Sequence, residues 1–135
     1  MEAASGKLQG KRAAGQLGED IACRYLEQQG QTVLARNWRS GHLELDIITL
    51  LGNELHIVVV KSRVAPVMAE PEQNVRRDKQ RRMVAAAHAF LHSADRKALP
   101  ADLEIVFDVM SVVFFGAGAD FEIEYYPNAF IPLYA

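Results

Sequence analysis

The sequence predicts an α/β fold in which a mixed central sheet is flanked by helices, in the order α-β-β-β-α-β-β. Two long stretches carry apolar residues at the helical spacings of three and four, and five shorter stretches show the alternating or continuous apolar runs of strands. Three strands separate the two helices, so the order differs from a regular βαβ repeat. The chain of 135 residues is long enough for a hydrophobic core, and we expect one domain over residues 1–135.

Both predicted helices have an apolar side. The first covers residues 7–29 and stops at Gly30, because glycine readily adopts the left-handed conformation that ends helices. Its apolar stripe consists of Ala14, Leu17, Ile21 and Tyr25. The second covers residues 73–93, after a loop that Pro66 and Pro71 interrupt. Its apolar side consists of Met83, Ala87, Phe90 and Leu91.

Five stretches are typical of strands. They lie at residues 32–38, 43–50, 55–62, 103–115 and 121–126. The dipeptide "GN" at 52–53 separates the second strand from the third and is typical of a two-residue hairpin loop. The third strand contains "IVVV" at 57–60, a continuous apolar run that predicts burial on both faces.

The hairpin loop predicts which side chains share a face. With the loop at 52–53, cross-strand partners have residue numbers that add up to 105, so Asp46 lies opposite Val59 and Glu44 opposite Lys61. The opposite face then carries Leu43, Leu45, Ile47, Val58 and Val60. The register therefore predicts a cluster of three charged side chains at one end of an otherwise apolar strand pair. An ion pair between Glu44 and Lys61 at a sheet edge would explain this cluster without a functional role.

The net charge of −2 is unevenly distributed along the chain. Residues 1–100 hold all 15 Lys and Arg but only 11 of the 17 Asp and Glu, so they carry a net charge of +4. The strongest basic run, "RRDKQRR" at 76–82, falls in the second predicted helix. A basic helix face is typical of nucleic-acid binding, although such a run can also be a solvated helix surface.

Several classes of function are disfavoured. Cys23 is the single cysteine and is expected to be a packed core thiol, and the N-terminus lacks an apolar signal segment, which favours a cytoplasmic protein. The apolar runs fall short of the roughly 20 residues of a membrane span, so no membrane partner is expected. His88 and His92 lie four apart on a helix without an evident third zinc ligand. His42 and His56 are expected to be ordinary, partly exposed side chains.

Six segments of the chain together resemble a known family. They are "GQLGEDIACRYL" (15–26), "ARNWRSGHLELDII" (35–48), "IVVVKSR" (57–63), "DKQRRM" (78–83), "FDVMSV" (107–112) and "NAF" (128–130). In combination they are similar to the YraN family of uncharacterised proteins, which is related to Holliday-junction resolvases. An Asp on one strand, followed after a turn by a strand that ends in Glu-x-Lys, is the pattern of the PD-(D/E)xK nuclease superfamily. The resemblance implies a nuclease-like domain with the restriction-endonuclease-like three-layer fold.

The resemblance also implies roles for individual residues. Asp46 would be the metal-binding carboxylate, Lys61 would position or activate the attacking water, and Glu19 would be an additional acidic group from the first helix. The backbone carbonyl of Val60 would be a further metal ligand, and Glu44 lies within reach of the same ion. The implied cofactor is Mg²⁺ or Mn²⁺, because phosphodiester hydrolysis requires a hard cation held by carboxylates.

The sequence departs from the nuclease pattern at the centre of the motif. The pattern reads Val-Glu-Val-Lys where this chain reads "VVVK" at 58–61, so Val59 replaces a metal-binding glutamate. Leu43 replaces a glycine of the pattern. Two functions remain open: a nucleic-acid-binding protein that does not cut, and an active metal-dependent endonuclease on branched or structured DNA that works with the remaining site residues. A protein-interaction module is a third and weaker alternative.

Nucleic acid, and DNA in particular, is the partner that these patterns favour. The basic residues expected to contact it are Arg36, Arg39, Arg63, Arg76, Lys79 and Arg82. Only part of the run at 76–82 can face one groove, because a helix turns by about 100° per residue. A resolvase-like task would favour a symmetric homodimer.

Overall fold

The computed structural model describes residues 11–66, 75–116 and 120–130. Its elements are α2 (Lys11–Gln28), β1 (Thr32–Ser40), β2 (Leu43–Leu51), β3 (Glu54–Val64), α3 (Arg77–Leu91), η1 (Ala94–Ala98), β4 (Glu104–Phe114) and β5 (Phe121–Tyr126). The predicted order α-β-β-β-α-β-β is confirmed, and η1 is a short 3₁₀ helix that the sequence patterns did not predict. The predicted starts of the two helices, at residues 7 and 73, lie outside the described residues.

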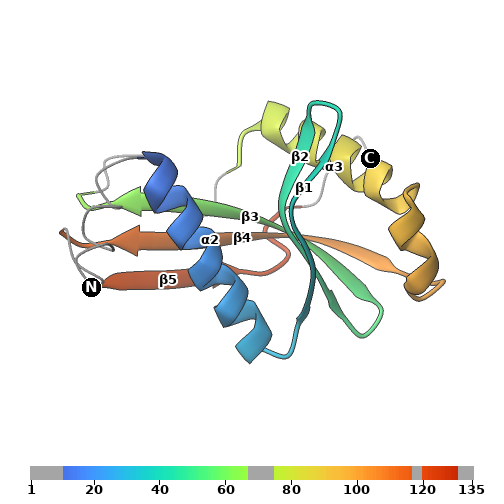
Figure 1. Ribbon diagram of the computed structural model, residues 1–135, viewed down its shortest axis with the longest axis horizontal. Coiled ribbons are helices and arrows are strands. Elements are labelled where there is room, and N and C mark those ends of the chain that lie inside the picture. Colours follow the sequence, from blue (N-terminus) through green and yellow to red (C-terminus); the bar gives the residue numbers. More distant parts are fainter. Residues whose placement is uncertain (1–10, 67–74, 117–119, 131–135) are drawn as a thin grey trace.

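A five-stranded mixed sheet forms the centre of the structure (Figure 1). The strand order is β1-β2-β3-β4-β5, with β3 parallel to β4 and all other neighbours antiparallel. The central strand β3 is buried on both faces as its apolar run predicts, because Ile57 and Val58 are 0% exposed and Val59 is 5% exposed.

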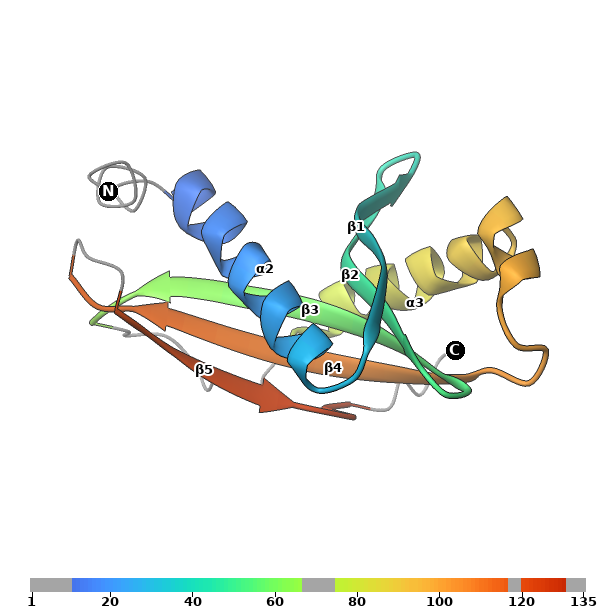
Figure 2. The same cartoon turned by 60° about the horizontal axis from the view of Figure 1, so that its bottom comes forward.

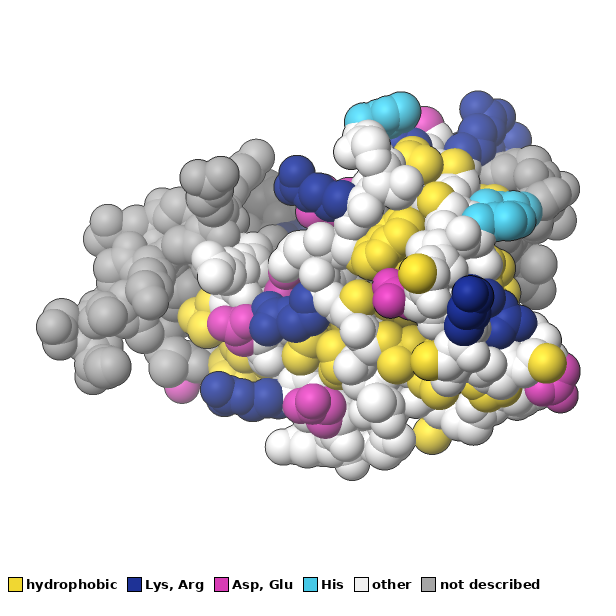
Figure 3. Space-filling view, turned by 45° about the vertical axis from the view of Figure 1, so that its right-hand side comes forward, with side chains coloured by type: hydrophobic (Ala, Val, Ile, Leu, Met, Phe, Trp, Pro, Cys, Tyr) yellow, Lys and Arg dark blue, Asp and Glu magenta, His cyan; other side chains and the backbone are white. Residues whose placement is uncertain are grey.

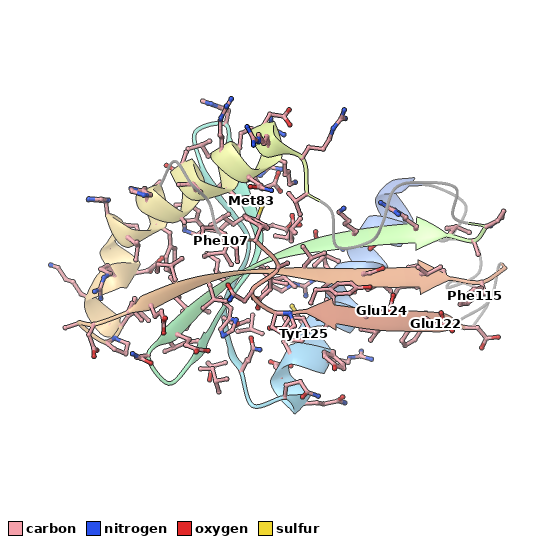
Figure 4. All side chains as sticks on the ribbon, turned by 180° about the vertical axis from the view of Figure 1, so that it is seen from behind. Met83, Phe107, Phe115, Glu122, Glu124 and Tyr125 are labelled. Carbon is pink, nitrogen blue, oxygen red and sulfur yellow. The ribbon has the colours of Figure 1, made fainter. Side chains whose placement is uncertain are left out.

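The two long helices pack against opposite faces of β3. Val58 belongs to the apolar cluster beneath α2, whereas its neighbours Ile57 and Val59 belong to the cluster beneath α3. In Figure 4, Met83 of α3 lies over Phe107 of β4, within the second of these clusters. The structure therefore has three layers, α2, sheet and α3. Neither helix that the structure describes is long and apolar enough to cross a membrane.

The face of α2 that meets the sheet is made largely of small residues. Its buried positions are Ala14, Gly18, Ala22, Cys23 and Leu26. The predicted stripe is confirmed, because Ala14 is buried and its other three members are partly buried against the same apolar cluster. Gly18 brings α2 close to the sheet: a Cβ atom at this position would lie 1.8 Å from the Oγ of Ser62 on β3. Close contact with the sheet therefore requires a small residue at this point of the helix.

The β2–β3 hairpin confirms the predicted register near its loop. Five pairs, from Ile47–Val58 to Leu51–Glu54, have residue numbers that add up to 105. Gly52 has φ +61°, as a two-residue hairpin loop requires.

The ladder between β2 and β3 ends sooner than the register predicts. Its last pair is Ile47–Val58, so the predicted pairs Asp46–Val59 and Glu44–Lys61 are not formed. Beyond this point the β1–β2 hairpin rises away from β3 and stands between α2 and α3, which Figures 1 and 2 both show. This break in the β2–β3 ladder is here called the gap, because β2 no longer pairs with the edge of β3 beyond Val58.

The bend of the hairpin changes which face its side chains occupy. Leu43 and Leu45 were expected on the same face as Val58, but both pack in the cluster beneath α3. Trp38 of β1 contacts Phe90 of α3 edge to face, with ring centroids 5.4 Å apart. The prediction for the two leucines is therefore wrong, because the departing hairpin turns their side chains toward α3.

A buried polar network crosses the middle of the sheet. Asp108 of β4 is fully buried and accepts hydrogen bonds from the Tyr125 hydroxyl and from the backbone N–H of Asn128, the latter at 2.8 Å. Its Oδ2 lies 2.6 Å from Nδ1 of His56, whose Nε2 lies 3.0 Å from Glu54 Oε1. His56 is only 5% exposed, so the expectation of a partly exposed side chain is wrong. Burial lowers the pKa of His56, but the hydrogen bonds and charges of Asp108 and Glu54 raise it overall.

Candidate functional site

Asp46 lies in the gap that opens where β2 leaves β3. Its Oδ2 accepts a hydrogen bond from the backbone N–H of Val60 at 2.9 Å. In a continued ladder a backbone carbonyl of β2 would accept this bond, so the carboxylate replaces a ladder partner. The N–H and C=O of one strand residue point to the same edge, and the carbonyl of Val60 therefore faces the gap as well. The structure thus brings together Asp46 and Val60, two of the predicted site residues.

Glu19 approaches Asp46 from α2. Burial raises the pKa of Glu19, and the nearby negative charge of Asp46 raises it further. A hydrogen bond with Asn37 and the charge of Arg36 oppose this increase. The effect of Asp46 on the pKa of Glu19 shows that the two carboxyl groups lie near each other, although they are far apart in sequence.

The pKa of Asp46 is also raised, first by burial. The hydrogen bond from Val60 and the positive charge of Lys79 on α3 oppose this increase, while the charge of Glu44 adds to it. The charge of one acidic group on β2 and of one basic group on α3 therefore acts on the Asp46 carboxylate.

A cavity of about 630 Å³, here called the acidic cavity, lies between α2 and the β1–β2 hairpin. Its wall includes Gln16, Glu19, Asp20, Arg36, Asn37 and Glu44. Arg36 forms an ion pair with Asp20 at 2.6 Å, and Arg39 on the same strand forms one with Glu44 at 3.5 Å. The predicted structural pair between Glu44 and Lys61 is therefore wrong, because the bent hairpin carries Glu44 to Arg39 instead. Two of the arginines expected to contact nucleic acid are paired with carboxylates here.

A second cavity of about 330 Å³, here called the basic cavity, lies between the end of β3 and the start of α3. Its charged wall residues are Lys61, Arg76, Asp78, Lys79 and Arg82. Asp78 and Arg82 form an ion pair at 3.4 Å within α3. Four basic groups and one acidic group give this wall a net charge of +3. Val60 also lines it, so the basic cavity borders Asp46.

The basic run on α3 is divided by the rotation of the helix, as the sequence predicts. Arg76, Lys79 and Arg82 share the basic cavity, and among the described residues Arg77 and Arg81 lie outside its wall. Arg63 is two residues after Lys61 on β3, in register with Val113. Figure 3 shows one face of the molecule, on which Lys and Arg side chains form several separate groups with hydrophobic side chains between them. In the basic cavity, by contrast, four basic side chains share one wall.

Val59 lines the basic cavity, but its side chain is only 5% exposed. It packs with Met83 and Val84 of α3 in the hydrophobic core, at the position where the nuclease pattern has a glutamate. Across the described ranges, no three His, Cys, Asp or Glu side chains are placed to hold one metal ion. At this position the chain therefore has an apolar contact and no metal ligand.

Sequence reasoning missed two features near Asp46. Asp20 and Asn37 complete the acidic cavity, and Asn37 has φ +50°, a left-handed conformation that Asn tolerates better than most residues. An Asn between two bulky residues of a predicted strand can indicate a left-handed backbone conformation at that residue. Elsewhere, the signal for the buried network was Asp108, a single charge within the apolar run of β4.

The fold and the site define an α/β protein in which a basic cavity borders the Asp46 carboxylate at a gap in the sheet. The model of Uncharacterised protein family UPF0102 matches residues 18–112, and the chain belongs to this family. The matched range contains both carboxylates, Glu19 and Asp46, and the basic run of α3.

Three bacterial relatives show the extent of the similarity. A UPF0102 protein of Bacteroides thetaiotaomicron is 40% identical over 118 residues, which cover 87% of this chain and 92% of the relative. A UPF0102 protein of Porphyromonas gingivalis is 39% identical over 116 residues, or 86% of this chain and 82% of the relative. One from Oleidesulfovibrio alaskensis is 41% identical over 103 residues, or 76% of this chain and 51% of the relative.

Proposed function

We propose that this protein binds nucleic acid, DNA in particular, through the basic cavity. The observation that carries the proposal is the net charge of +3 on one cavity wall, assembled from β3 and from α3. A phosphate backbone is the partner that such a wall favours, because Lys and Arg neutralise phosphates and release their counterions. Arg76 and Arg82 can each offer two parallel N–H donors to one phosphate.

The start of α3 adds backbone donors to the same wall. Arg76 is its N-cap and makes no side-chain capping hydrogen bond, and the first turn includes Asp78 and Lys79. The free N–H groups of a first helical turn attract anions. Asp78 competes for one of them, because its pKa is lowered first by a hydrogen bond from the Lys79 backbone N–H.

Replacement of Arg76 and Lys79 together by alanine is expected to weaken DNA binding. If both side chains contact phosphates, the slope of log affinity against log salt concentration should also fall by about two units. Fluorescence anisotropy with a labelled oligonucleotide over a series of salt concentrations measures both quantities.

Arg77→Ala with Arg81→Ala is the matched control, since it removes the same charge from the same helix outside the cavity wall. The control should retain most of the affinity and most of the salt dependence. Equal losses in the two double variants would mean that the run acts as a general basic surface, and that the cavity has no special role.

The fold that we propose for this binding is of the PD-(D/E)xK, resolvase-like type. The element order, the position of Asp46 at the gap and the position of Lys61 on β3 beside the basic cavity support the resemblance. On this proposal the loss of a glutamate at Val59 leaves a binding protein whose ability to cut is impaired.

An active metal-dependent endonuclease is the second candidate, and the proximity of Glu19 and Asp46 favours it. Mg²⁺ needs only one or two protein carboxylates when water and substrate phosphates supply its other ligands. This candidate predicts cleavage of branched or linear DNA in Mg²⁺ or Mn²⁺ that Asp46→Asn abolishes. A gel assay on branched and on linear DNA measures this cleavage. Cleavage that persists in Asp46→Asn would point to a contaminating nuclease.

A further inference from the structure

We infer that the basic cavity binds a nucleic-acid phosphate directly, with the ammonium group of Lys79 acting beside Asp46 where a metal-dependent site would hold a divalent cation. This inference rests on the proposed function and adds to it that binding needs no metal ion. Three observations carry it: the position of Lys79, the charge of the cavity and the partners of the carboxylates.

The position of Lys79 connects α3 with the gap in the sheet. Lys79 and Val60 line the same cavity, and the backbone N–H of Val60 binds the carboxylate of Asp46. The charge of Lys79 counteracts the increase that burial causes in the pKa of Asp46. Lys79 therefore already supplies positive charge beside Asp46, the carboxylate that would have to bind a metal ion.

The charge of the cavity discriminates between a phosphate and a divalent cation. Lys61, Arg76 and Lys79 are cationic, and the charge of Arg82 is partly offset by Asp78 at 3.4 Å. A divalent cation that entered this wall of net charge +3 would meet like charges. An anion would meet opposite charges, in a recess where solvent screens them less than at an open surface.

The carboxylates near the gap have partners other than a metal ion. Asp46 accepts the N–H of Val60, and Glu44 is paired with Arg39 at 3.5 Å. Glu19 has a hydrogen bond with Asn37. At the remaining position of the nuclease pattern Val59 packs in the core. Protein groups thus satisfy the acidic side of the gap, and the basic side is left to hold the phosphate.

The test compares DNA binding in EDTA and in Mg²⁺ at equal ionic strength, with a short fluorescein-labelled oligonucleotide and the full chain. The dissociation constant is expected to be the same in both buffers within about twofold, since the phosphate is held by side chains alone. Lys79→Ala should weaken binding by about tenfold in both buffers, as the loss of one charge-assisted hydrogen bond predicts. Lys97→Ala, on η1, is the matched control and should bind like the parent.

A second measurement uses no DNA. Isothermal titration of the parent with inorganic pyrophosphate in EDTA should show binding that Lys79→Ala loses and Lys97→Ala keeps. Mn²⁺ should leave the melting temperature of the parent unchanged, because Lys79 already supplies positive charge beside Asp46.

The outcomes separate this inference from the function on which it rests. DNA binding that requires Mg²⁺, or a Mn²⁺-dependent rise in the melting temperature of the parent, would overturn the inference and leave nucleic-acid binding intact. Absence of DNA binding in both buffers would overturn the proposed function, while pyrophosphate binding that depends on Lys79 would still support the phosphate site. Absence of pyrophosphate binding as well would overturn both.

Discussion

Val59→Glu is expected to be strongly destabilising in the presence of a chelator and to be rescued by a divalent metal ion. Val59 is 5% exposed and packs against α3, so a buried carboxylate there should lower the free energy of unfolding by up to about 2–4 kcal/mol, a loss that the basic groups of the adjoining cavity wall offset in part. The new carboxylate would supply the acidic group that the nuclease pattern has at this position, beside the gap that holds Asp46. Thermal melts in EDTA, Mg²⁺ and Mn²⁺ measure the effect.

The rescue follows from mass action. An ion that binds only the folded state and is present at a hundredfold excess over its dissociation constant adds about 2.7 kcal/mol to the free energy of unfolding. The same variant should cleave DNA faster than the parent, because it regains the missing ligand of the nuclease pattern.

Val59→Gln is the matched control for this experiment. It has nearly the same size and polarity as the glutamate but no charge, so it should be destabilised and should not respond to metal. If Val59→Glu shows no larger metal-dependent rise in melting temperature than Val59→Gln, the proposed geometry around Asp46 is wrong.

Asp108→Ala is expected to lower the free energy of unfolding by a similar amount, because it removes the centre of a buried polar network. The substitution removes the acceptor of the Tyr125 hydroxyl and of the Asn128 backbone N–H, and the partner of His56 at 2.6 Å. Removal of one member of a buried ion pair typically lowers stability by about 3–5 kcal/mol. Chemical denaturation followed by circular dichroism measures this loss.

Glu54→Ala tests the other partner of His56. The side chain of Glu54 is 42% exposed, so its ion pair should contribute less than about 1 kcal/mol. An equal loss of stability in Asp108→Ala and Glu54→Ala would contradict the assignment of Asp108 as the centre of the network.

The same network predicts a pH dependence of stability. The pKa of His56 is raised above its ordinary value of 6.5, so the folded state binds the proton more tightly than the unfolded state. The contribution of the pair is fully present below pH 6.5 and is lost as the pH rises through the raised pKa. Asp108→Asn keeps the size of the side chain and should flatten this part of the stability profile.

Local sequence patterns were sufficient to predict the two long helices and the five strands of this fold. The "GN" loop at 52–53 and the apolar run of β3 specified the hairpin and its register, because loop length and alternation act on neighbouring residues. The same patterns placed Arg76, Lys79 and Arg82 on one side of α3. The position of Asp46 near Val60 also followed, although through a hydrogen bond rather than through a ladder pair.

The errors concern contacts between distant segments. The early end of the β2–β3 ladder depends on how the hairpin packs on α3, through Trp38 and Phe90, which no local pattern specifies. The burial of His56 depends on Asp108, 52 residues later in the chain. The close approach of α2 to β3 at Gly18 and Ser62 likewise joins segments that no local pattern connects.

The contact between Gly18 and Ser62 has a consequence for how the site can change. Glu19 follows Gly18 in α2, and Ser62 follows Lys61 in β3, so this uncharged contact fixes the spacing between the acidic and the basic side of the gap. Any side chain at residue 18 would push α2 away from β3, because its Cβ would otherwise lie 1.8 Å from the Ser62 hydroxyl oxygen. A substitution at Gly18 would therefore change the spacing around Asp46, although residue 18 carries no charge and is not one of the proposed binding residues.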